Sequence, residues 1–173
     1  MIEGLTIRPL VITDLPDYKQ MRDEMLLAHP DAFTSDPAAE KKKEPADYLH
    51  RLGTDRRGGG HFLLGAWSDM HIVGAIGCER ELRLKVQHIG HVIGMMVRPE
   101  ARGHGVGRDL LDTCIAEARR TPGLEMLTLT VTTGNTAAIR LYESSGFVAY
   151  GSLPRALKLG STYHSKLHMA LTL

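Results

Sequence analysis

A turn with glycine at every second position, placed between a predicted strand and a predicted helix, constrains this fold more than any other feature. The turn reads Arg102-Gly-His-Gly-Val-Gly107. It follows an apolar stretch at 92–97 that ends before Pro99, and apolar residues at helical spacing follow it over 110–118. Such a chain must bring a strand end and a helix start together, which is typical of a mixed α/β fold.

The same turn predicts an anion-binding site. Because its glycines lack Cβ atoms, a ligand can approach the backbone closely. The following helix directs unpaired N–H groups and the positive end of its dipole into the turn, and Arg102 and Arg108 add charge. These features favour a phosphate or pyrophosphate ligand; the alternative is a connector that binds nothing. The spacing matches neither the dinucleotide motif Gly-x-Gly-x-x-Gly nor a Walker loop ending in Gly-Lys-Ser or Gly-Lys-Thr.

Strand and helix patterns alternate along the rest of the chain. Period-two alternation with β-branched residues predicts strands, and apolar residues three or four apart predict helices. We expect strands at 5–10, 62–67, 72–78, 92–97, 127–132, 147–150 and 167–173, and helices at 14–28, 36–52, 110–118 and 135–145. The 173 residues fit a single domain, 1–173, because domains commonly have roughly 100–200 residues.

Composition excludes several functional classes. The 21 Lys and Arg against 20 Asp and Glu give a formal charge of +1, which argues against a nucleic-acid partner. No apolar run reaches the ~18 residues of a membrane span, and no signal-peptide pattern is present, so we expect a cytoplasmic protein.

Cys78 and Cys114 lie in apolar stretches, where reduced, buried thiols are expected. The nine histidines lack partners at metal-site spacing, so we expect no metal.

Two motifs resemble those of one enzyme family. The glycine turn is similar to the Arg/Gln-x-x-Gly-x-Gly/Ala turn of the GNAT superfamily of acetyl-coenzyme A-dependent N-acetyltransferases. Residues 135–147 are similar to its second motif, Asn-x-x-Ala-x-x-Leu-Tyr-x-x-x-Gly-Phe. The resemblance is strong over 92–150. It implies the GNAT fold, an α/β arrangement with about four helices and a central mixed, mostly antiparallel sheet of about six or seven strands, splayed between the fourth and fifth.

The resemblance also implies how acetyl-CoA, the cosubstrate, is held. The backbone N–H groups of 102–108 would bind the pyrophosphate, and the pantetheine arm would pair like an extra strand with Met96 and Val97. An N–H group of either residue would stabilise the oxyanion. The implied cofactor-binding residues are Met95, Met96, Val97, Arg102, Gly103, His104, Gly105, Val106, Gly107, Arg108, Asn135, Ala138 and Tyr142.

Asn135 and Tyr142 are seven residues apart, almost two helical turns, so both project from one face about 10.5 Å apart. The resemblance implies that Asn135 binds the pantetheine arm, although it can also cap the helix. It implies that Tyr142 is the general acid for the departing thiolate. With a thiol pKa near ~8.5 and a phenol pKa near ~10, that proton transfer is feasible. The alternative for Tyr142 is a tyrosine that only packs.

The sequence does not assign the general base to one residue. The acceptor amine is mostly protonated at neutral pH and must lose a proton before it attacks. Many relatives use a glutamate on the fourth strand, where this chain carries His88 and His91. A histidine with a pKa near ~6.5 can serve as a base, although either can equally be an ordinary polar residue at a strand start. Glu79 and Glu81 are weaker candidates.

Taken together, the sequence predicts an N-acetyltransferase in which a primary amine of a small molecule or peptide attacks the acetyl thioester directly. Because both cysteines are expected in the core, no covalent cysteine route is expected. The family implies that acceptor specificity comes from 14–52 and 155–166, and a homodimer is also expected. The alternative is a non-catalytic acyl-CoA sensor, which the missing strand glutamate favours and Tyr142 disfavours. The identity of the acceptor amine stays open.

Overall fold

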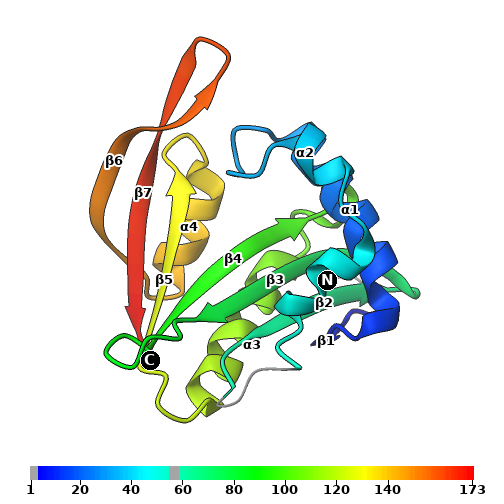
Figure 1. Ribbon diagram of the computed structural model, residues 1–173, viewed down its shortest axis with the longest axis horizontal. Coiled ribbons are helices and arrows are strands. Elements are labelled where there is room, and N and C mark those ends of the chain that lie inside the picture. The colour runs from blue at the N-terminus through cyan, green and yellow to red at the C-terminus, as the bar shows by residue number, and fades with distance from the viewer. Residues whose placement is uncertain (1–3, 55–58) are drawn as a thin grey trace.

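The computed structural model describes residues 4–54 and 59–173. Seven strands in this part of the chain form one sheet in the order β1-β2-β3-β4-β5-β7-β6 (Figure 1). Every neighbouring pair is antiparallel except β4 and β5, which are parallel. The predicted mixed, mostly antiparallel sheet is therefore confirmed. The strands are β1 (Thr6–Pro9), β2 (Phe62–Ser68), β3 (His71–Arg80), β4 (Ile89–Val97), β5 (Met126–Thr132), β6 (Val148–Leu159) and β7 (Thr162–Thr172).

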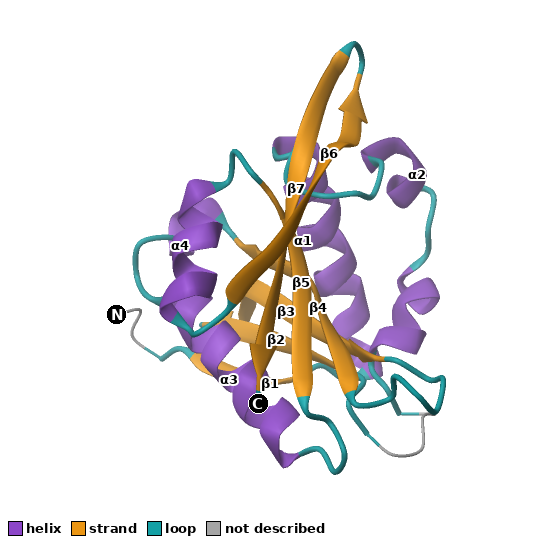
Figure 2. Ribbon diagram, turned by 90° about the vertical axis from the view of Figure 1, so that its left-hand side faces the viewer, coloured by secondary structure: helices purple, strands orange, loops and turns teal. Residues whose placement is uncertain are grey.

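Helices cover both faces of the sheet (Figure 2). On one face, α3 and α4 bury a stripe that includes Leu110, Leu111 and Cys114 against the strands. On the other face, α1 buries Tyr18 and Met21. The helices are α1 (Leu15–Ala28), α2 (Pro37–Lys41), α3 (Val106–Arg120) and α4 (Thr136–Ser144), with 3₁₀ turns at Ile12–Asp14, Pro45–Arg51 and Pro99–Ala101.

The parallel strands β4 and β5 separate after a short paired stretch, as predicted. Their pairing runs only from Ile89 with Met126 to His91 with Thr128, and Figure 1 shows the two strands diverging beyond it. On its other side β4 pairs with β3 through an irregular register, and there Gly94 has a φ of +56°. A bulge of this kind bends a strand and redirects its side chains. The second half of β4 therefore has a free edge at the opening.

The predicted helix over 36–52 is wrong. The segment divides into α2, whose N-cap Asp36 accepts a hydrogen bond from the N–H of Ala39 at 2.8 Å, and the 3₁₀ turn Pro45–Arg51. Pro45 explains the break, because proline has no N–H group and disfavours helical geometry in the residue before it.

The closing strands are longer than predicted. The stretches 147–150 and 167–173 belong to a long β6–β7 hairpin that projects beyond the rest of the sheet (Figure 1). Pro154 concealed the continuity of β6, since proline is rare inside a strand. The structure accommodates it at a register irregularity between Leu153 and Leu157. The other predicted strands and helices are confirmed with shifts of a few residues at their ends.

Candidate active site

A pocket of about 660 Å³ occupies the opening between β4 and β5. Its walls come from the second half of β4, the glycine turn, the end of β5, the start of α4 and the loop between α1 and α2. Of the cofactor-binding residues implied by the sequence, His104 alone does not line it. The lining includes Met95, Met96, Val97, Arg102, Gly103, Gly105, Val106, Gly107, Arg108, Asn135, Ala138 and Tyr142.

The glycine turn has the geometry of an anion site. Gly103 and Gly105 have φ values of +77° and +90°, in the left-handed region that favours glycine. A Cβ atom on Gly103 would meet nothing within 4 Å, so the space above the backbone is open. Gly105 is also the N-cap of the 15-residue helix α3, whose first N–H groups and positive dipole end face the turn. The turn therefore offers backbone donors to a phosphate group.

Two arginines fix the turn to its surroundings. The Nε of Arg102 donates a hydrogen bond of 3.0 Å to the carbonyl oxygen of Val97, at the end of β4. The Nη2 of Arg108 donates one of 2.6 Å to the Oγ of Ser144, on α4. Both arginine residues are exposed and add positive charge beside the glycine turn.

Tyr142 lies on α4 and is only 8% exposed. Its Oη donates a hydrogen bond to the Sδ of Met95, 3.4 Å away on β4, and its ring contacts Phe147 edge to face at 5.9 Å. Burial raises the pKa of Tyr142 to about 12, with a further contribution from Cys114. The phenol is therefore protonated at neutral pH and directed at the edge of β4. Asn135 caps α4, accepting a hydrogen bond of 3.2 Å from the N–H of Ala138.

The four base candidates named from the sequence lie outside the pocket lining. The Nδ1 of His91 lies 2.6 Å from the Oγ1 of Thr128, and its Nε2 lies 3.2 Å from the Oε1 of Glu81. Both ring nitrogens are thus partnered, at the place where β4 and β5 are still paired. His88 lies just before β4, and Glu79 stands opposite His91 on β3.

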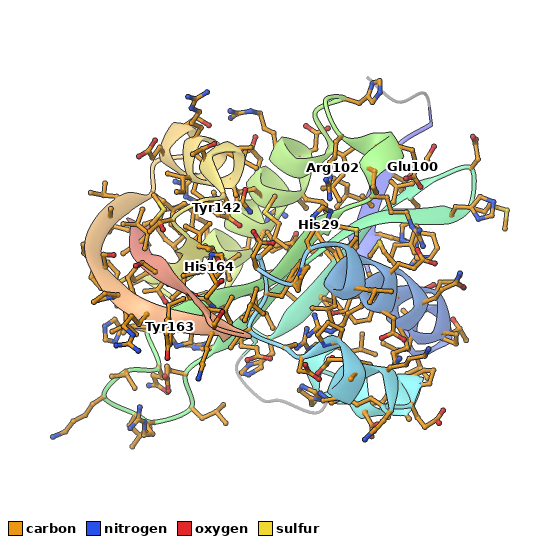
Figure 3. All side chains as sticks on the ribbon, turned by 90° about the horizontal axis from the view of Figure 1, so that it is seen from above. His29, Glu100, Arg102, Tyr142, Tyr163 and His164 are labelled. Atoms are coloured by element: carbon orange, nitrogen blue, oxygen red, sulfur yellow. The ribbon has the colours of Figure 1, made fainter. Side chains whose placement is uncertain are left out.

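The loop between α1 and α2 forms the remaining wall. It lies within 14–52, the range to which the family resemblance assigned acceptor specificity, but no single residue in it was named as a site residue. His29, Asp31 and Phe33 from this loop line the pocket. The Nη2 of Arg102 lies 2.9 Å from the Nε2 of His29 (Figure 3). An arginine can only donate, so that ring nitrogen is the acceptor. The segment His29-Pro-Asp-Ala-Phe stands out in the sequence, but no local pattern indicates its position.

A buried ionic cluster supports β4 from the side of α1. Glu40 accepts hydrogen bonds from the Nε of Arg22 at 2.9 Å and from the Oη of Tyr48 at 2.6 Å, and it is also paired with Lys43. The cluster reaches the bulge, because a Cβ atom on Gly94 would lie 3.8 Å from the Nη1 of Arg22 and 3.3 Å from the Nη1 of Arg51. Gly94 therefore lets the guanidinium group of Arg51 pack against the pocket wall.

The other sequence expectations concern cysteines, metals and membrane spans. Burial raises the pKa of Cys78 to about 12, and it raises the pKa of Cys114 still further. Over residues 4–54 and 59–173, no group of three potential metal-ligating side chains comes together. No helix in that same part of the chain is long and apolar enough to cross a membrane.

Comparison with known proteins gives consistent matches. Residues 18–147 match the model of the Acetyltransferase (GNAT) family. A mycothiol acetyltransferase from Geodermatophilus obscurus is 36% identical over 112 residues, which are 65% of this chain and 32% of that protein. The chain thus spans about a third of the length of that relative.

Solved structures share the fold along nearly the whole chain. A GNAT-family acetyltransferase from Streptococcus pneumoniae has a TM-score of 0.87 and 24% identity, with 98% of this chain and 100% of that chain covered. The structure of yncA from Salmonella typhimurium with its cofactor acetyl-CoA has a TM-score of 0.85 and 22% identity, with coverage of 99% and 95%.

Proposed function

Because the chain belongs to the Acetyltransferase (GNAT) family, we propose that it transfers the acetyl group of acetyl-CoA directly to a primary amine of a small molecule or peptide. The observation that carries this proposal is the pocket at the separation of β4 and β5. The glycine turn with its backbone donors and the buried phenol of Tyr142 both line it.

The same walls fit the cosubstrate. We assign the pyrophosphate of acetyl-CoA to the backbone N–H groups of 102–108, with Arg102 and Arg108 contributing charge. The pantetheine arm pairs with the free edge of β4 at Met96 and Val97 in this proposal. The support is that β4 has no pairing to β5 beyond His91, so the backbone groups on that side have no strand partner; the carbonyl oxygen of Val97 accepts a hydrogen bond from the Nε of Arg102.

The chemistry follows from these positions. The amine nitrogen attacks the thioester carbon, and an N–H group of Met96 or Val97 stabilises the oxyanion. The C–S bond then breaks, and Tyr142 protonates the departing sulfur. A pKa of about 12 keeps Tyr142 in the protonated form that this step requires. Direct transfer is supported by Cys78 and Cys114, whose buried thiols are poor nucleophiles.

For the acceptor, similarity to a mycothiol acetyltransferase supports a small molecule with a primary amine. We also propose that the chain forms a homodimer through β6. Val148, Tyr150 and Leu153 on this edge strand are 69%, 64% and 53% exposed, which is unusual for large apolar side chains gathered on one strand. Light scattering of the purified protein tests the dimer: a monomer mass at micromolar concentration contradicts it.

A thiol-release assay with acetyl-CoA and a panel of amino acids, polyamines, amino sugars and short peptides tests the proposed function. Mass spectrometry of the products should show one added acetyl group on nitrogen. The account predicts turnover for at least one class. Binding of acetyl-CoA without turnover of any amine would instead support the acyl-CoA sensor.

A further inference from the structure

We propose that Asp31 binds the ammonium group of the acceptor and takes its proton; this inference rests on the proposed acetyl transfer. Asp31 is the one carboxylate among the described residues that line the pocket. The other ionisable side chains there are His29, Arg102, Arg108 and Tyr142. An alkylamine arrives as a cation and must lose a proton to become a nucleophile. The pocket therefore needs an anionic group that can bind the ammonium ion and accept its proton.

The backbone of Asp31 is fixed in place. The Oγ1 of Thr132, at the end of β5, donates a hydrogen bond of 2.6 Å to the carbonyl oxygen of Asp31. Three residues further on, the hydroxyl of Thr34 is hydrogen-bonded to the Nζ of Lys166 on β7. These two contacts hold the loop across the opening between β4 and β5. They fix the α1–α2 loop relative to β5 and β7.

The carboxylate of Asp31 is also free to act. It makes no hydrogen bond and no ion pair with any described residue, and it is exposed to solvent, to which it can pass a proton. Its acidic neighbours in sequence are already engaged. Asp36 caps α2, and Glu40 is held by the buried cluster around Arg22.

The ionisable side chains that line the pocket with Asp31 are all positive or neutral. Arg102 and Arg108 make the end at the glycine turn positive, and His29 accepts from Arg102 on that side. The Nζ of Lys166 donates its hydrogen bond to the Oγ1 of Thr34 and not to Asp31. Asp31 therefore supplies the one negative group among the described pocket residues that can attract an ammonium ion.

His91, one of the two histidines that the sequence offered as the base, fits this role less well. Its two ring nitrogens lie against Thr128 and Glu81, and it does not line the pocket. A base must reach the proton it removes, directly or through one water molecule. Because Asp31 lines the pocket and His91 does not, position favours Asp31 as the base.

The proton balance is complete with these groups. The acceptor ammonium gives one proton to the Asp31 carboxylate, and the neutral nitrogen forms the C–N bond. The nitrogen then loses its second proton to solvent as the C–S bond breaks. The sulfur takes a proton from Tyr142, which solvent replaces. The net products are the N-acetylated amine, coenzyme A and one released proton.

The test compares two acceptors in wild type and Asp31→Asn. One is the best primary alkylamine from the panel, and the other is its O-alkylhydroxylamine analogue, which is neutral at pH 7. We expect Asp31→Asn to lower kcat/KM for the alkylamine by about 10²- to 10⁴-fold, the usual range for a general base. It should change kcat/KM for the neutral analogue far less. Asp31→Glu should restore part of the activity.

Asp36→Asn is the matched control, because it removes the same charge from the same segment and asparagine caps a helix as well as aspartate does. It should act like wild type, and all variants should bind acetyl-CoA equally. Equal losses for both acceptors, or none, would overturn the role of Asp31 and leave the proposed function standing. Failure of wild type to acetylate any amine would overturn both.

Discussion

The phenol oxygen of Tyr142 lies 3.4 Å from the sulfur of Met95 and donates a hydrogen bond to it, joining α4 to β4 across the opening. Thioether sulfur is a weak acceptor, so this contact is easily replaced. In the proposed reaction, the sulfur of the thioester takes over the same proton.

Replacing Tyr142 by phenylalanine tests the general-acid role. Phenylalanine keeps the edge-to-face contact with Phe147 and loses only the hydroxyl. We expect kcat to fall by about 10²- to 10⁴-fold, as for other positioned acids, with no change in affinity for acetyl-CoA. Steady-state kinetics and calorimetry measure the two quantities. Unchanged kcat would return Tyr142 to a packing role.

The pH dependence of kcat gives a separate test of the same residue. Burial raises the pKa of Tyr142 from an ordinary value of 10.0 to about 12. A general acid works in its protonated form, so a raised pKa extends activity to higher pH. We expect no loss of kcat from ionisation of Tyr142 as the pH rises from neutrality to about 10. A descending limb below pH 10 that disappears in Tyr142→Phe would contradict the burial argument.

The part of this site that could be predicted from the sequence is the part formed by contiguous motifs. The glycine turn and the helix bearing Asn135 and Tyr142 are contiguous in sequence, and helical geometry relates them to one ligand. The α1–α2 loop was not predictable in the same way. Its contacts to Arg102, Thr132 and Lys166 join residues that are 73, 101 and 132 positions apart. No local pattern reports such distant contacts.

The segment 36–52 and the residue His91 were also only partly predictable from the local sequence. The helical spacing over 36–52 concealed the effect of Pro45, which divides the segment into two short turns. For His91, the sequence indicated only a place on the fourth strand. The partners that occupy its nitrogens, Thr128 and Glu81, come from β5 and from the residue after β3, and only the fold brings them together.

The cysteines should be unreactive in the folded protein. Cys78 and Cys114 are 1% and 0% exposed, and burial raises the pKa of each thiol. The reactive thiolate is therefore scarce near neutral pH. Ellman's reagent should label neither residue quickly in buffer and both in urea. An acetylated cysteine found by mass spectrometry during turnover would contradict direct transfer.

Stability should depend on the buried carboxylate of Glu40. Its burial would raise the pKa, but hydrogen bonds from Lys43, Tyr48 and Arg22, together with the charge of Arg22, lower it from 4.5 to about 2. The ionised form is therefore stabilised by folding. Its contribution is present above pH 4.5 and is lost as the pH falls from 4.5 towards 2.

Glu40→Gln measures this contribution. Removing one partner of a buried ion pair costs about 3–5 kcal/mol, so the free energy of unfolding should fall by about 3 kcal/mol at pH 7. Urea denaturation at pH 7, 5 and 3 should show the difference from wild type shrinking at the lowest pH. Glu143→Gln, an exposed charge on α4, is the control and should change little. A difference independent of pH would contradict the ionic role.

Isothermal titration calorimetry with acetyl-CoA tests whether the glycine turn binds the cofactor. Wild type, Gly105→Glu and Gly160→Glu should be compared. Both glycines have positive φ values, +90° and +56°, so both variants carry backbone strain, but Gly160 lies in the β6–β7 turn outside the pocket. The account predicts that wild type and Gly160→Glu bind and that Gly105→Glu does not. Equal binding by all three, or by none, would contradict the assignment of the glycine turn to the cofactor.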